Sequence, residues 1–158
     1  METSSKRLNA GLSLAILLAI LGLGLWVCLP GLGRESLWGD EINLAYPALQ
    51  PTVSETMELV QKPHSVGYPV FLHYWMKAGT GETFLRLPSL ACGVLSLLLL
   101  YLFLDRVGSR RVALTAAFFL ALSPAHVRFS REVAAYSPQI AVLIGAALFW
   151  IRALEGNR

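Results

Sequence analysis

Two adjacent carboxylates, Asp40 and Glu41, end the stretch Ser36–Glu41, in which a tryptophan and a glycine precede them. They come shortly after a long segment without charge. If that segment crosses a membrane, both carboxylates lie at the water interface on its far side. A carboxylate in such a place can accept the proton of a hydroxyl group and act as a general base. The structural alternative is that the pair caps a short helix and is solvated in a loop.

A second polar segment lies nearer the C-terminus. Arg128, Glu132 and Tyr136 fall at four-residue spacing, so they share a face if the segment is helical. Arg131 lies about 100° from Glu132 around such a helix and can point toward a different partner. Arg86 stands at the start of another uncharged stretch, where a cation either binds a phosphate or anchors a helix end. For Arg131 and Glu132 the alternative is a local surface ion pair.

The composition is that of a polytopic membrane protein. Hydrophobic residues make up 55% of the chain and charged residues 15%, whereas soluble domains carry about a quarter charged residues. The charges lie between long uncharged runs, which predicts an all-α fold with about four transmembrane helices in a single membrane domain, residues 1–158. No basic face with exposed aromatic residues is present, so no nucleic-acid partner is expected. Cys28 and Cys92 both fall in apolar runs, so no disulfide is expected.

The uncharged runs predict spans at residues 8–29, 87–104, 112–127 and 137–152. An external loop is expected over residues 30–66, with short helices at 40–49 and 54–61, the second one capped by Ser54. Residues 67–79 are rich in aromatic side chains but short of the length of a span. They form either an interfacial helix, which the charge placement favours, or a short spanning one.

The basic residues indicate the orientation. Lys6 and Arg7 precede the first span, and the clusters at 106–111 and 152–158 follow later ones. The positive-inside rule therefore predicts a cytoplasmic N-terminus in the plasma (inner) membrane. The loop that carries Asp40 is then external, or periplasmic, and so is the segment 128–136.

Several motifs in this order resemble the GT-C membrane glycosyltransferases. These are the Trp-x-Asp-Glu of the first loop, the run Gly81–Ser89, and the run Ala121–Glu132 with Tyr136 after it. Together they are similar to the branch that contains protein O-mannosyltransferases and the aminoarabinose transferases that modify lipid A. The likeness covers nearly the whole chain.

This resemblance implies a transferase that moves a sugar from a polyprenyl-phosphate carrier to an acceptor at the outer membrane face, with inversion at the anomeric carbon. By the same resemblance Asp40 is the base and Glu41 orients the acceptor or the loop, while other residues bind substrate. The developing phosphate charge needs cations. The candidate substrate-binding residues are Trp38, His64, Arg86, Arg131, Glu132 and Tyr136, with Lys62 as a further cation. No metal ligand set is predicted, although a divalent metal could lie between the carboxylates.

Two functions remain open at this point. Family chains usually run to several hundred residues, so this chain is expected to be either an N-terminal part or a short product that keeps half an active site. The alternative to a transferase is a non-catalytic membrane module that binds a lipid carrier or the helices of a partner subunit, because a half-site closes poorly around a donor. A third interpretation, a small transporter subunit, is weaker, since the predicted spans hold almost no charged residues. Membrane lipids are partners in every case.

Overall fold

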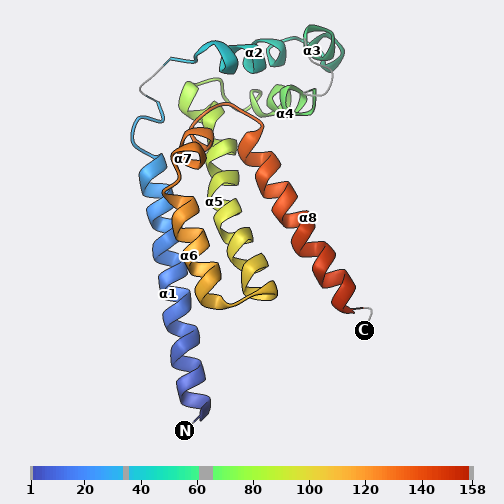
Figure 1. Ribbon diagram of the computed structural model, residues 1–158. Helices are drawn as coiled ribbons and strands as arrows, with labels where there is room; N and C mark the ends of the chain where they lie inside the picture. Colours follow the sequence, from blue (N-terminus) through green and yellow to red (C-terminus); the bar gives the residue numbers. More distant parts are fainter. Residues whose placement is uncertain (1, 34–35, 61–65, 157–158) are drawn as a thin grey trace.

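The computed structural model describes residues 2–33, 36–60 and 66–156, for residues 2–9 the backbone alone. All the regular secondary structure in these ranges is helical, with no strand, which confirms the all-α prediction (Figure 1). The helices are α1 (Glu2–Cys28), α2 (Gly39–Ala48), α3 (Val53–Leu59), α4 (Gly67–Trp75), α5 (Glu82–Val107), α6 (Arg110–Ala121), α7 (Pro124–Ser130) and α8 (Tyr136–Gly156).

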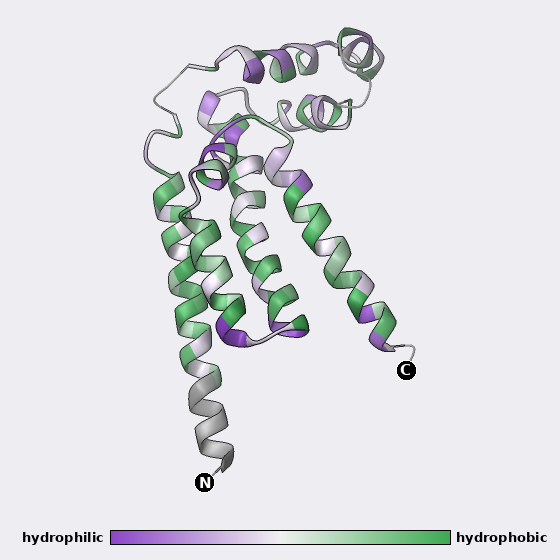
Figure 2. Cartoon of the chain, in the orientation of Figure 1, coloured by the Kyte–Doolittle hydropathy of each residue, from purple (hydrophilic) through white to green (hydrophobic). Residues whose placement is uncertain are grey.

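Three helices, α1, α5 and α8, are long and apolar enough to cross a bilayer, and the bent pair α6–α7 makes a fourth candidate. Figure 2 shows their apolar residues along most of their length, and hydrophilic residues at the turn between α5 and α6 and near the described end of α8. The chain is therefore an integral membrane protein, as its composition predicts.

The prediction of one continuous helix over residues 112–127 is wrong. The structure has two helices there, α6 and α7, which meet at an angle of 65°. Pro124 explains the break, because a proline disfavours helical geometry in the residue before it. Ser123 accordingly has the extended angles φ −64° and ψ 123°, and Pro124 begins α7. The bend directs α7 and its polar residues across the end of the bundle.

The bundle core is closely packed through small residues. Ala113, Ala117 and Ala121 on α6 are fully buried against Leu97 of α5 and residues of α1. Such small side chains let apolar helices approach closely. In lipid this close packing is needed, because there is no hydrophobic driving force for one helix to associate with another. α5 also packs closely against α7, because Gly93 leaves room for the side chain of Ser130.

The helices α2, α3 and α4 form a layer across one end of the bundle, the end opposite the first turns of α1 (Figure 1). α4 has only 9 residues, about 14 Å of helix, which is too short to cross a bilayer. Buried His73 ties α4 to the other two helices, through Ala48 O of α2 at 3.2 Å and Thr56 of α3 at 3.5 Å.

α3 is capped by Thr52 and not by Ser54 as predicted, since the Thr52 hydroxyl accepts the Glu55 N–H.

A proline in α5 also helps to hold this layer. Pro88 has no N–H to donate to the carbonyl of Phe84 four residues earlier. The Phe84 carbonyl instead accepts the indole N–H of Trp75, from the last turn of α4, at 3.0 Å. The two rings stack with centroids 4.7 Å apart. The C-terminal end of α4 is therefore anchored on the start of α5.

Candidate functional site

A buried ion pair joins the layer to the bundle. The Arg86 guanidinium of α5 donates to both carboxylate oxygens of Glu41 in α2, from Nε at 2.9 Å and from Nη2 at 2.7 Å. Its Nη1 donates to the carbonyl of Leu32, after α1, at 2.7 Å. Glu41 is 1% exposed and Arg86 4%. A two-point pair of this kind sets the orientation of α2 as well as its distance from α5.

The same carboxylate holds the segment between α7 and α8. Glu41 accepts the N–H of Val133 at 2.7 Å and that of Trp38 at 3.3 Å. Burial acts to raise the pKa of Glu41, but the hydrogen bonds from Arg86 and Val133 outweigh it, so the pKa lies below its ordinary value. Glu41 is thus ionised at neutral pH, and its oxygens are occupied by protein donors.

A second contact fixes the same segment. Ser89 of α5 donates its hydroxyl proton to Ala134 O at 3.0 Å, and its oxygen lies 3.1 Å from the Tyr68 hydroxyl of α4. Ala134 precedes the first turn of α8, so its carbonyl takes no part in the helical hydrogen bonds of α8. α4, α5 and residues 131–135 therefore meet at one place, directly beside α2.

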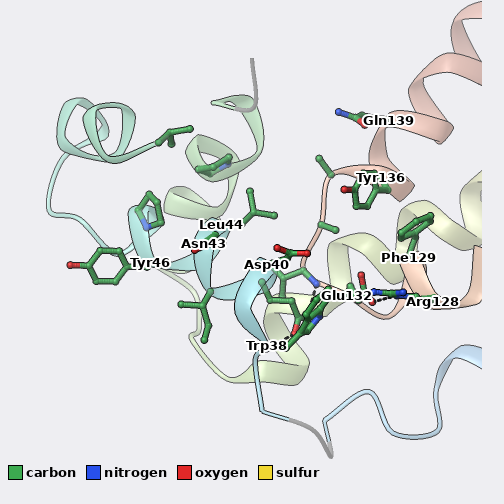
Figure 3. A pocket seen from close by; sticks show the side chains of 18 of the residues that line it. Trp38, Asp40, Asn43, Leu44, Tyr46, Arg128, Phe129, Glu132, Tyr136 and Gln139 are labelled. Carbon is green, nitrogen blue, oxygen red and sulfur yellow. Dashed lines mark hydrogen bonds and ion pairs between the residues drawn. The ribbon is translucent and has the colours of Figure 1, made fainter. Parts of the chain in front are cut away.

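This arrangement leaves a pocket of about 660 Å³ between α2, the end of α7 and the start of α8. Asp40 lies on its α2 wall, exposed, and its carboxylate makes no hydrogen bond to any described residue. Figure 3 shows the carboxylate of Asp40 between Asn43 on one side and Arg128 and Glu132 on the other. An exposed carboxylate on a pocket wall can accept a proton from a bound hydroxyl group.

The opposite wall carries the polar end of α7. Arg128 pairs with Glu132 at 2.7 Å and lies over the ring of Trp38, its Cζ 5.4 Å from the centroid. Tyr136, the first residue of α8, packs against Phe129 with centroids 4.5 Å apart. Aromatic faces and carboxylates can bind a sugar ring, since its C–H groups pack against aromatic rings and its hydroxyls donate hydrogen bonds to carboxylates.

An apolar groove of about 670 Å³ adjoins the pocket. It lies between α4, α5 and α8, and it shares two lining residues with the pocket, Ala135 and Gln139. Its other walls include Phe71, Pro88 and Val142. A polar pocket thus continues into an apolar groove at the end of the bundle, the arrangement that a ligand with a polar head and a hydrocarbon tail would need.

A protein-family model described as dolichyl-phosphate-mannose-protein mannosyltransferase matches residues 64–158, more than half of the chain. The chain belongs to this family. Membership in the mannosyltransferase family makes it a GT-C membrane glycosyltransferase and supports a lipid-linked sugar donor. No curated protein and no solved structure shows significant similarity to it.

The mannosyltransferase match begins after α2, so it includes the α7 side of the pocket but not Trp38, Asp40 or Glu41. Those residues are tied to the matched range by contacts, chiefly by the Glu41–Arg86 pair. The pocket is therefore formed by two parts of the chain, one inside the family match and one before it.

The structure separates the residues that the sequence singles out. Trp38, Asp40, Glu132 and Tyr136 line the pocket. Glu41 contributes to its wall with a buried carboxylate, and Arg86 is buried behind it. Arg131 lies outside the lining, with its guanidinium directly against Gly31 after α1. His64 and Lys62 fall outside the described residues.

Arg128, a charged residue of the pocket in this mannosyltransferase-family chain, is absent from the predicted binding set. Its four-residue spacing to Glu132 could have indicated it, because residues at this spacing share a face of a helix. The two side chains do form an ion pair, although α7 ends at Ser130 and Glu132 lies beyond it. Among the described residues no group of three or more His, Cys, Asp or Glu side chains could hold a metal. Glu41 in particular has its oxygens engaged by Arg86 and by backbone N–H groups.

Proposed function

We propose that this pocket is the transfer site of a glycosyltransferase that moves a sugar from a polyprenyl phosphate to an acceptor hydroxyl at the outer face of the membrane. The observation that carries the proposal is the exposed Asp40 carboxylate, which faces Arg128 and Glu132 across a pocket that continues into an apolar groove. Family membership supports the lipid-linked donor.

Asp40 is the general base in this proposal. Its carboxylate takes the proton of the acceptor hydroxyl while that oxygen forms a bond to the anomeric carbon. The bond between this carbon and the phosphate oxygen breaks, and polyprenyl phosphate leaves with the electron pair. Phosphate is a good leaving group, so no general acid is needed. One displacement of this kind inverts the anomeric centre, as the resemblance to GT-C enzymes implies.

Glu41 and Arg86 act as positioning residues. The oxygens of Glu41 are occupied by donors from Arg86, Val133 and Trp38, so its carboxylate is not available to take a substrate proton. It holds α2, and therefore Asp40, at a constant place relative to residues 131–135. Trp38, Glu132 and Tyr136 surround the sugar.

The apolar groove takes the first isoprene units of the donor. Its walls carry the rings of Tyr68 and Phe71 and the aliphatic side chains of Val142 and Leu143. Burying isoprene there is favourable by roughly 25 cal/mol per Å² of apolar surface removed from water. The groove lies along the first turns of α8, so the rest of the tail can continue into the surrounding membrane lipids.

The orientation follows from charge. Arg106, Arg110 and Arg111 lie around the α5–α6 turn, at the end of the bundle away from the pocket (Figure 2). The positive-inside rule assigns this end to the cytoplasm of an inner-membrane protein and the pocket to the external or periplasmic side.

Sugar transfer by the reconstituted full chain tests the proposal. With a polyprenyl-phosphate sugar and candidate acceptors in liposomes, Asp40→Asn should lower the transfer rate by about 10²–10⁴-fold, the usual contribution of a general base. Glu58→Gln, which neutralises an exposed carboxylate on α3 that is not part of the pocket lining, serves as the matched control. Undiminished transfer by Asp40→Asn excludes Asp40 as the base.

A second candidate is a module that binds the lipid carrier, or packs against a partner subunit's helices, without catalysing transfer. The exposed apolar side chains of α8 favour it, among them Leu143, Phe149 and Trp150. In the same experiment this candidate requires that the chain bind polyprenyl phosphate and yet transfer no sugar to any acceptor.

A further inference from the structure

We propose that Arg128 is the cation that binds the donor phosphate, and that Glu132 is its partner only while the pocket is empty. The donor phosphate then takes the place of the Glu132 carboxylate on the guanidinium. This inference rests on the proposed function, because it assumes that a lipid-linked phosphate enters the pocket. It adds a named phosphate-binding residue and an exchange of ion pairs.

The other two arginines that the structure describes in this region lie elsewhere. Arg86 is buried behind α2, with its guanidinium on Glu41 and Leu32 O. Arg131 lies against Gly31, on the side of α1. Among the described residues that line the pocket, Arg128 is the only arginine or lysine. A phosphate in this pocket meets Asp40 and Glu132 as well, so it needs a cation there.

The Arg128–Glu132 pair is suited to exchange. The Arg128 side chain is 61% exposed and that of Glu132 is 16% exposed, at i,i+4 spacing near the end of a short helix. Exposed pairs of this kind are weak. The contact shown is a single one, from Nε to Glu132 Oε1 at 2.7 Å. A phosphate carries more charge and accepts two parallel N–H groups of a guanidinium, so it competes well for Arg128.

Trp38 keeps the guanidinium inside the pocket during this exchange. Its ring lies under Arg128, with Cζ 5.4 Å from the centroid, within the range of a cation–π attraction. Arg128 can turn from Glu132 toward a phosphate without leaving the face of this ring. The Trp38 backbone N–H is itself bonded to Glu41, so the ion pair that positions α2 also positions the platform under Arg128.

The groove places the phosphate on the same side. A tail in the groove passes Ala135 and Gln139, the residues that groove and pocket share. Figure 3 shows Gln139, Tyr136 and Arg128 following one another along this wall of the pocket. The head group of a lipid that enters from the groove therefore arrives beside Tyr136 and reaches Arg128 next.

Two lipids of equal chain length separate phosphate recognition from tail recognition: a polyprenyl phosphate and the corresponding polyprenol. Their dissociation constants for the full chain in nanodiscs give a phosphate preference as a ratio. Arg128→Gln should reduce this preference by about tenfold or more, as expected for the loss of a charge-assisted contact, and Arg128→Lys should restore part of it. Glu132→Gln should increase the preference severalfold, because the competing carboxylate is gone.

Arg131→Gln is the matched control, since it makes the same charge change three residues away and outside the lining. The inference is overturned if Arg128→Gln keeps the wild-type phosphate preference, or if Arg131→Gln reduces that preference as much as Arg128→Gln does. It is also overturned if Glu132→Gln lowers the phosphate preference. A wild-type chain that binds both lipids equally overturns the proposed function as well. Arg128→Gln can lose the phosphate preference while the wild-type chain binds polyprenyl phosphate and yet transfers no sugar. That result supports Arg128 as the phosphate-binding residue and counts against the proposed transferase activity.

Discussion

Asp40 and Glu41 are neighbours in sequence and nearly identical in chemistry, but they have opposite environments. Residues one apart on a helix point about 100° away from each other. In α2 this rotation turns Asp40 to the pocket and Glu41 to the interior, where Arg86 and Val133 surround it. The division lets one carboxylate remain available to a ligand while the other holds the helix that carries both.

Removing one partner of the buried pair should destabilise the chain strongly. Glu41→Gln removes the charged carboxylate that accepts two hydrogen bonds from the buried Arg86 guanidinium. Breaking a buried ion pair from one side costs about 3–5 kcal/mol. Denaturant or thermal unfolding in detergent measures the loss of stability. The double variant with Glu41→Met and Arg86→Met, which has no buried charge at either position, should recover part of this stability. Glu155→Gln, which breaks an exposed pair with Arg106, is the control and should change little. Equal losses from both pairs would contradict the positioning role of Glu41.

At the scale of helices, the pocket depends on how closely α7 approaches α5. Gly93 makes this approach possible: a Cβ there would lie 2.8 Å from the Cβ of Ser130 and closer still to its hydroxyl. The bend at Pro124 directs α7 across the bundle end, and Gly93 lets it pack there. Together they place Arg128 and Glu132 opposite α2.

Gly93→Ala should therefore move α7 and disturb the pocket together with the fold. Overpacking of this kind costs about 1–3 kcal/mol, and we expect weaker binding of polyprenyl phosphate alongside it. Ser130→Gly in the same chain removes the overlapping atoms and should restore part of the binding. Gly22→Ala is the control, because a Cβ at Gly22 meets nothing within 4 Å. Normal binding by Gly93→Ala would show that the contact is not needed.

The whole molecule has two parts, a bundle of apolar helices and a layer of short helices across one end. The first turns of α1 and the last turns of α8 lie at the other end (Figure 1). An acceptor at the outer face can reach the pocket only if the layer is external, since the pocket lies between the layer and the bundle. The orientation of the chain in the membrane is thus part of its proposed function.

Labelling of single cysteines tests this orientation. In a chain with Cys28→Ala and Cys92→Ala, an impermeant maleimide added to intact cells should modify Ser54→Cys on α3. Gly156→Cys, at the end of α8, should react only after the membrane is opened. Both positions are exposed, so access to the reagent decides the result. The reverse pattern would place the pocket in the cytoplasm and contradict the topology that the basic residues indicate.

Much of the fold could be predicted from the sequence, because uncharged runs, prolines and basic clusters act locally. The length of an apolar run decides whether a helix can cross a membrane, and this holds for α1, α5 and α8 without knowledge of their neighbours. The break before Pro124 was missed although its signal is local. The apolar run continues through it, and a run of that length was interpreted as one straight helix.

The site was predictable as a set of polar segments and not as an arrangement of side chains. Composition, charge placement and the order of motifs were sufficient to indicate an all-α membrane protein of the GT-C kind with polar residues near Asp40 and near Arg131. Packing decided that Asp40 and Arg128 face the pocket, whereas Glu41 and Arg131 face the protein. Asp40 and Glu41 are neighbours on α2, so a rotation of that helix would exchange their environments, and Arg131 follows Arg128 by three positions, just after α7 ends. That rotation is set by contacts between distant segments, above all Glu41 with Arg86 and Gly93 with Ser130, which no local pattern encodes.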